Sequence, residues 1–173
     1  MTKLPKNKNQ KAAGKAFTLL ELVLVMVIIV IAAVLAVPMM GSAADIQVRS
    51  AANMVASDLE YAKSMAISRQ QNHSVVFDTA NESYEIRNAS GTVIAHPLKG
   101  GSFVVNLQTD SRISRVDIAS ADFDSQSTVT FDYLGSPYNG SGTALNSGQI
   151  TLQAQDFTMS INVEPMTGYV TIQ

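Results

Sequence analysis

The longest apolar stretch of the sequence lies near its N-terminus. Residues 22–44 form 23 consecutive positions without a charged side chain. As an α-helix this stretch would be about 35 Å long, which is enough to cross the hydrocarbon core of a bilayer. It is longer than the ~7–15-residue apolar region of an ordinary secretory signal. The pattern therefore predicts a single membrane-spanning helix.

The charge before this stretch predicts its orientation. Residues 1–16 hold five lysines and no acidic residue, and basic flanks favour the cytoplasmic side. We therefore expect a cytoplasmic N-terminus and a C-terminal body outside the inner membrane. A second interpretation stays open, because the small residues 42–44 resemble a secretory cleavage site. Cleavage there would release a soluble periplasmic binding module that begins at Asp45.

Beyond residue 41 the pattern changes to that of an amphipathic helix. Apolar residues recur at steps of three and four, which places them on one helical face. The residues on this face are Val48, Ala52, Val55, Leu59, Ala62 and Ala66. Pro38 is expected to end or kink the preceding apolar helix, because it removes a backbone hydrogen bond. A straight helix from Phe17 to about Arg69 would be roughly 80 Å long.

The remaining residues, 70–173, show short alternating runs that are separated by turn residues. Such runs predict β-strands. The expected strands cover residues 74–78, 84–87, 92–95, 103–107, 128–133, 149–155, 157–163 and 169–172. The glycine-rich segment 135–148 is expected to be a loop. The predicted fold class is α+β, with a long N-terminal helix packed on an antiparallel β-sheet head.

Composition narrows the possible functions. The chain has 173 residues, of which 46% are hydrophobic and 15% charged, and it has no cysteine. These values exclude a disordered chain, a disulfide framework and any Cys-ligated metal. The formal net charge is −2, but removal of residues 1–16 leaves seven basic and 14 acidic side chains, a net charge of −7. An acidic body repels phosphate backbones, so we expect no nucleic-acid partner.

Little in the sequence indicates catalysis. His73 and His96 are the two histidines, too few for a three-histidine zinc site, and both are expected to be surface turn residues. Asp117, Asp122 and Asp124 could ligate calcium, but they lack the glycine and the distal glutamate of an EF-hand loop. An exposed acidic loop is the preferred interpretation. We therefore expect a non-enzyme with no cofactor, no metal and no small-molecule substrate.

One acidic residue, Glu21, precedes the apolar run. A carboxylate costs about 2.5–3.5 kcal/mol at the bilayer centre and less near its edge. Glu21 could reach the interface, or gain about 0.3–1 kcal/mol from the dipole of a helix that begins at Phe17. Alternatively, it could pair with a cation inside an assembly of such helices. The α-amine of a new N-terminus at Phe17 on a neighbouring subunit would be the natural cation.

The segment FTLLELVLVMVIIVIAAVLAVP, behind a basic leader, resembles the N-terminus of type IV pilins and type II secretion pseudopilins. The resemblance implies that a prepilin peptidase cleaves between Ala16 and Phe17 and that the amine of Phe17 is methylated. Glu21 is then the fifth mature residue and the assembly residue. Ala16 stands where the family usually has glycine. The implied organisation is a cleaved leader (1–16), a transmembrane and filament-core helix (17–44), a stalk helix (45–69) and a periplasmic head (70–173).

The head resembles the GspH/FimT group of minor pilins and pseudopilins. The similar segments are residues 52–77, the sequence FDYLG at 131–135, Val163 and the sequence TGYV at 167–170. Many relatives carry arginine after the Thr-Gly turn, and DNA-uptake members are thought to grip DNA there; this chain has Tyr169 and Thr171 instead. The resemblance implies an H-type minor pseudopilin of a type II secretion system, in a periplasmic pseudopilus with other pseudopilins. The alternative is a minor type IV pilin.

Overall fold

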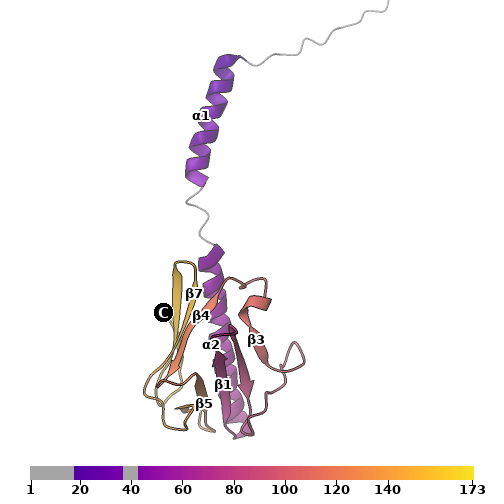
Figure 1. The fold of residues 1–173 in the computed structure, drawn as a ribbon, viewed down its shortest axis with the longest axis vertical. Coiled ribbons are helices and arrows are strands. Elements are labelled where there is room, and N and C mark those ends of the chain that lie inside the picture. The colour runs from indigo at the N-terminus through magenta and orange to yellow at the C-terminus, as the bar shows by residue number, and fades with distance from the viewer. Residues whose placement is uncertain (1–17, 37–42) are drawn as a thin grey trace, which may run out of the picture. The chain divides into compact units, whose positions relative to one another are not determined.

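The computed structural model describes residues 18–36 and 43–173 (Figure 1). The chain divides into two compact units, Met1–Met40 and Gly41–Gln173. The first unit contains helix α1, Leu19–Ala36. The second unit, here called the head, contains helix α2, Ala43–Arg69, and every described strand. Pro38 and the expected kink lie outside the described residues.

Helix α2 is amphipathic, as its sequence predicts. Its buried face consists of Ala44, Val48, Ala51, Ala52, Val55, Leu59, Ala62 and Ala66. All six positions that the spacing indicates are on this face, so that prediction is confirmed. The many alanines allow close packing, and α2 contacts strands of both sheets of the head.

The end of α2 has an identifiable cause. The amides of Gln70 and Gln71 donate to the carbonyls of Ile67 and Ala66 at 3.3 and 3.2 Å. Gln70 has a positive φ of 53°. This is a Schellman motif, in which a left-handed residue lets the chain satisfy the last helical carbonyls. The helix therefore ends where the polar segment 70–72 predicts.

The first sheet has five strands in the order β3-β2-β1-β5-β6, and all its pairs are antiparallel. Its strands are β3 (Val104–Asn106), β2 (Ser83–Arg87), β1 (His73–Asp78), β5 (Thr128–Phe131) and β6 (Pro137–Asn139). A short 3₁₀ helix, Leu107–Thr109, follows β3. The strand β1 lies at the centre of this sheet. It pairs on one side with β2, the next strand in the sequence, and on the other side with β5 from later in the chain.

The second sheet has four strands in the order β4-β7-β8-β9, again antiparallel throughout. Its strands are β4 (Asp117–Phe123), β7 (Gly148–Ala154), β8 (Phe157–Val163) and β9 (Val170–Ile172). Figure 1 shows β4 and β7 on one side of α2 and β3 on the other. The α+β fold class, a helix with antiparallel sheets, is confirmed.

The core of the head joins the helix and both sheets. The Phe77 ring of β1 stacks on Phe123 of β4, with centroids 5.8 Å apart, and meets Tyr84 of β2 at 5.5 Å. Leu59 of α2, Ile86 of β2 and Leu152 of β7 are all completely buried. The head thus has its own hydrophobic core, as an independent domain requires.

Three expectations about the strands are wrong. The segment 92–95 makes only isolated bridges, Arg87–Val93 and Ala95–Ser102. The expected loop 135–148 contains β6. The strand β4 was not predicted, because a bulge between Ile118 and Ser120 shifts the register and thereby breaks the period-two alternation from which strands are recognised.

The acidic residues near β4 therefore do not form the expected loop. Asp117 and Asp122 lie within the strand, with their side chains on its exposed positions. Asp124 follows the strand, in a turn with a positive φ of 55°. Its carboxylate accepts hydrogen bonds from the backbone amides of Asn146 and Ser147 at 3.0 Å. Its role in the structure is to hold two segments of the head together.

Candidate functional site

Helix α1 exposes apolar side chains on every side. Between Leu19 and Ile31 each large apolar residue is exposed, from 45% for Val25 to 83% for Leu19. Glu21 is the only charged residue of the helix. Transfer of one such side chain from water to an apolar environment is favourable by about 1.5–3 kcal/mol. The helix α1 is therefore most stable where apolar groups surround it on all sides. The side chains of α1 are typical of a helix that is surrounded by apolar groups.

The start of α1 gives Glu21 a local structural role. The backbone amide of Glu21 donates a hydrogen bond to Oγ1 of Thr18 at 3.2 Å. Thr18 therefore caps the helix, and the sequence Thr18-Leu19-Leu20-Glu21 matches the capping-box pattern, in which Glu or Gln is the third helical residue. The spacing of threonine and glutamate signals this role, which was not among the predictions made for Glu21. The Glu21 side chain itself is exposed.

The other residues predicted for processing and assembly are not in the described part of the chain. Ala16 and Phe17, at the expected cleavage site, and Pro38 lie outside the described residues. Among the helices that the structure describes, none combines the length and the apolar character needed to cross a membrane.

In the head, the two C-terminal segments that carry the family resemblance meet on α2. The turn of residues 131–136 brings the carbonyl oxygen of Gly135 beside Gly168, where an added Cβ would be only 2.6 Å from it. Gly168 also has a positive φ of 60°, which favours glycine. An added Cβ at Gly135 would lie 3.0 Å from Cδ1 of Ile67 on α2. Two turns and the end of the helix are therefore in direct contact.

Lys63 of α2 fixes this contact. Its Nζ donates to the carbonyl of Gly168 at 2.9 Å and pairs with Glu60 at 2.8 Å. The Lys63 side chain is only 16% exposed, whereas Glu60 is 44% exposed. A cation held in this way joins residues 105 positions apart. The sequence carries no pattern from which that pairing could be predicted.

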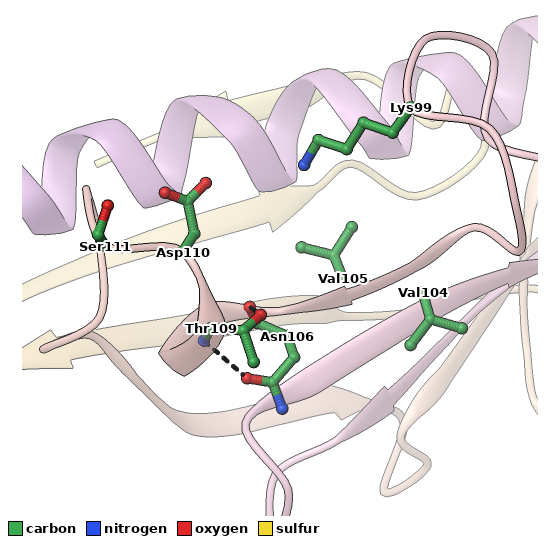
Figure 2. Close-up of a pocket in the computed structure, with 7 residues that line it drawn as sticks. All are labelled: Lys99, Val104, Val105, Asn106, Thr109, Asp110 and Ser111. Atoms are coloured by element: carbon green, nitrogen blue, oxygen red, sulfur yellow. Dashed lines mark hydrogen bonds between the residues drawn. The ribbon is translucent and has the colours of Figure 1, made fainter.

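A cleft of about 290 Å³ lies beside β3 and the 3₁₀ helix that follows it. It is lined by Lys99, Val104, Val105, Asn106, Thr109, Asp110 and Ser111. Figure 2 shows the Lys99 side chain reaching from its loop across the space that Asp110 also faces. Hydrogen bonds from the Arg112 side chain lower the pKa of Asp110 to about 2. Because Asp110 is paired with Arg112, the cleft is polar but has no unpaired carboxylate among its lining residues.

Near this cleft a partly buried carboxylate meets a buried phenol. The Tyr84 hydroxyl donates to Oδ2 of Asp58 at 2.5 Å. Burial raises the pKa of Asp58, and the bond from Tyr84 opposes that rise. Burial, together with the negative charge of Asp58, also raises the pKa of Tyr84 well above its usual value. This pair links α2 to β2 and serves the packing of the head.

The histidines differ from the expectation in one case. His73 is buried, at 1% exposure, as the first residue of β1. Its Nδ1 donates to the carbonyl of Gln71 at 2.9 Å. The prediction of a surface turn residue is wrong, because β1 begins only four residues after α2 ends and His73, Val75 and Phe77 share its inward face. His96 does lie in a turn, stacked on Phe103 with ring centroids 4.4 Å apart.

The described residues show no candidate metal centre. In residues 18–36 and 43–173, no three His, Cys, Asp or Glu side chains are grouped so that they could hold a metal ion. Two features of the described surface could bind a partner. One is the apolar surface of α1, and the other is the pair of turns held together at the end of α2.

Comparison with known proteins identifies the family. The profile of the GspH family, described as type II transport protein GspH, matches residues 51–167. The match covers 117 of the 173 residues, from within α2 to the Thr-Gly turn. The chain belongs to the GspH family. The resemblance seen in the sequence is thereby confirmed.

Solved structures of a minor pilin are similar to this GspH family member. The Pseudomonas aeruginosa PAO1 type IV minor pilin FimU, in a P21 crystal, is 20% identical over 73% of this chain and 86% of its own, with a TM-score of 0.45. In a P65 crystal it is 18% identical over 72% of this chain and 91% of its own, with a TM-score of 0.47. No curated protein matches the sequence significantly.

Membership of this family places the chain in a broad functional class. It is a pilin-like minor pseudopilin or pilin, a structural protein rather than an enzyme. Proteins of this class assemble with other pilins or pseudopilins into a periplasmic pseudopilus or a pilus.

Proposed function

We propose that this protein is an H-type minor pseudopilin of a type II protein secretion system. The observation that carries this proposal is α1, an apolar helix exposed on all sides whose one charge, Glu21, lies in its first turn. Helices of this kind bury their surfaces by packing against one another in a filament core. The family, described as a type II transport protein, favours secretion over a pilus.

Assembly begins from a membrane precursor in this proposal. A single-pass anchor in the bacterial inner membrane holds the N-terminus in the cytoplasm and the head in the periplasm. The support comes from the sequence, since the charge-free stretch 22–44 continues past the last residue of α1, Ala36, into residues 37–42 outside the described part. Five lysines in residues 1–16 support the orientation.

Processing prepares the helix for assembly. Prepilin peptidase cleaves between Ala16 and Phe17, and the new amine of Phe17 is methylated. Thr18 then becomes the second residue of the mature chain and remains available to cap α1. The proposed organisation keeps a leader at 1–16, a filament-core helix at 17–44, a stalk helix at 45–69 and a periplasmic β-rich part at 70–173. The stalk helix and the β-rich part belong to the unit called the head above.

Glu21 gives assembly its specificity. Transfer of α1 from lipid to an apolar filament core changes its hydrophobic surroundings little, so the lone carboxylate becomes decisive. An unpaired charge in an apolar interior is strongly unfavourable, whereas a paired one fixes the relative position of its partners. The α-amine of Phe17 on a neighbouring subunit is the proposed cation.

The first test is the mass of the mature protein isolated from membranes of cells that express prepilin peptidase. We expect an N-terminus at Phe17 that carries one methyl group. An intact N-terminus at Met1 would contradict the proposal, and an N-terminus at Asp45 would instead indicate a released soluble module. A Phe17→Ala variant tests whether methylation depends on the side chain at the new terminus.

A second experiment separates the two filament systems. Deletion of the gene should abolish secretion of folded proteins across the outer membrane and leave pilus-dependent motility and DNA uptake intact. Loss of pili with normal secretion would instead identify a minor type IV pilin.

A further inference from the structure

The two turns at the end of α2 carry an unusual number of exposed apolar side chains. We define the distal patch as Ile67, Tyr133, Leu134, Met166 and Tyr169, whose exposed fractions lie between 46% for Ile67 and 84% for Met166. Tyr133 and Leu134 precede Gly135, Met166 and Tyr169 flank Gly168, and Ile67 contacts the Gly135 position. The segments that carry the patch are therefore in contact.

The backbone under the distal patch is fixed. The Asp132 side chain accepts hydrogen bonds from the amides of Leu134 and Ser136 at 2.8 Å. The amide of Gly168 donates to the carbonyl of Glu164 at 2.9 Å, and Lys63 holds the Gly168 carbonyl from the other side. A preorganised surface loses little conformational entropy on binding. Exposed apolar side chains on a rigid base indicate a binding surface rather than a loose loop.

The composition of the distal patch is that of an interface core. Tyrosine and methionine are enriched at interfaces, and charged residues are depleted from interface cores. The distal patch holds two tyrosines, one methionine and two aliphatic residues. Contiguous apolar patches of about 300–600 Å² are the largest found on ordinary monomers and are often functional. The exposed apolar side chains of the distal patch belong to three segments of the head that contact one another.

The charges around the distal patch constrain its occupant. Asp132 and Glu164 belong to the same two turns, and Lys63 is already paired with Glu60. Arg69 follows Ile67 by two positions, which do not face each other on a helix. The head from residue 43 onwards has seven basic and 13 acidic side chains, a net charge of −6. A second copy of this acidic head would be repelled, whereas a partner with a basic rim would be attracted.

The position of the distal patch within the head indicates the direction of contact. It lies at the C-terminal end of α2, a helix of 27 residues and therefore about 40 Å long, whose other end leads to α1. Filaments form through head-to-tail contacts, in which one end of a subunit binds a different surface of the next. An apolar patch at the C-terminal end of α2 suits such a contact.

We infer that the distal patch binds the head of a different pilin-like subunit, one that presents an apolar surface with basic side chains at its rim. This inference rests on the proposed function, because assembly into a filament brings the heads of different subunits into contact.

The absence of cysteine from the chain allows a direct test. The full-length Leu134→Cys variant is expressed in cells with the other subunits of its filament and treated with a reagent that joins a thiol to a nearby amine. Leu98→Cys is the matched control, since Leu98 is 91% exposed on a loop far in sequence from the patch. We expect an adduct between Leu134→Cys and a different pilin-like subunit, at least tenfold stronger than any from the control.

Double variants test whether the adduct depends on the apolar side chains of the distal patch. A Tyr169→Cys variant should form the same adduct, and adding Leu134→Lys should reduce it at least tenfold, whereas adding Leu98→Lys should not. Equal adducts at both leucines, an adduct only between copies of this chain, or no protein adduct would each overturn the inference. The N-terminus and the filament content of the same cells are measured in parallel. A chain that is processed and incorporated but forms no adduct contradicts only the distal patch, whereas a chain that is not processed or not incorporated contradicts the proposed function.

Discussion

Helix α1 and the head use apolar residues in opposite ways. Leu24 in α1 is 53% exposed, whereas Leu59 in α2 is completely buried between the helix and the sheets. The head gathers its apolar residues into one core, but α1 has them on all sides. The head is therefore stable by itself, and the stability of α1 depends on what surrounds it.

This difference in burial determines which process each region's apolar residues stabilise. A buried leucine contributes to the free energy of unfolding of its own chain, whereas an exposed leucine contributes only after association. Polar groups follow the same division. Asp58, Lys63 and Asp124 in the head have partners within the head, while the Glu21 carboxylate is exposed on a helix of apolar side chains.

A matched pair of substitutions tests the contrast most strongly. Leu59→Ala should lower the free energy of unfolding of the head by about 2–5 kcal/mol, because it removes a buried side chain and leaves a cavity. Leu24→Ala should leave that free energy unchanged. Chemical denaturation of the detergent-solubilised protein, followed by the tyrosine signal of the head, measures both. Similar losses from the two variants would show that α1 supports the head.

The contact between the two turns provides a second comparison. Gly168→Ala forces a Cβ to within 2.6 Å of the Gly135 carbonyl and should cost about 2–4 kcal/mol, from this clash and the left-handed backbone together. Gly142→Ala is the control, since Gly142 also has a positive φ but open space around it; its cost should be about 1–2 kcal/mol. Equal thermal shifts for the two variants would mean that the turns do not touch as described.

The Asp58–Tyr84 pair tests the polar packing of the head. Asp58→Ala leaves the buried Tyr84 hydroxyl without its acceptor and should cost about 1–3 kcal/mol at neutral pH. Asp58→Asn keeps an acceptor oxygen and should cost less. Equal losses for these two variants would show that the carboxylate charge, not the hydrogen bond, is what matters.

The pH dependence of the same pair has a defined sign. Because burial raises the pKa of Asp58 in the folded state, the native protein binds more protons than the unfolded chain just above pH 3.8, and stability falls as the pH rises through the folded pKa. Asp110, whose pKa is lowered to about 2, acts in the opposite direction, losing its contribution as the pH falls. The difference between the wild type and Asp58→Asn isolates Asp58 and should increase in favour of the variant from pH 4 to pH 7.

The smallest expected effect concerns the helix cap. Thr18→Ala should destabilise the first turn of α1 by about 1 kcal/mol, because it removes the acceptor for the Glu21 amide. Hydrogen exchange of the Leu20 and Glu21 amides in detergent micelles measures this, with Thr18→Ser as the variant that keeps the cap. Unchanged exchange in Thr18→Ala would contradict the capping role.

The fold was predictable where local pattern and burial agree. The inward face of α2, the stop at Gln70 and most strands follow from periodicity, because a helix or strand with one buried face repeats its apolar residues. The bulge in β4 removed that repeat, so the strand was missed. His73 was misplaced because a polar residue after a helix stop resembles a turn, although the two-residue alternation through Val75 and Phe77 continues to it.

The candidate sites divide in the same way. The sequence alone indicates Glu21 and the apolar helix, because both are local features. The contacts between Lys63, Gly135 and Gly168 join three distant segments, and only the tertiary structure brings them together. The same is true of the distal patch, whose five members look like ordinary scattered surface residues in the sequence.

The central claim is that Glu21 is tolerated in an apolar helix because its charge is neutralised by a neighbouring subunit. The most direct measurement is the amount of Glu21→Gln protein in purified filaments, relative to the amount processed in the membrane. Glutamine can still occupy the capping-box position but carries no charge. The account predicts normal processing and near-complete exclusion from filaments for Glu21→Gln, and the same result for Glu21→Ala. Incorporation of Glu21→Gln at the wild-type level would contradict it and reduce Glu21 to a helix cap.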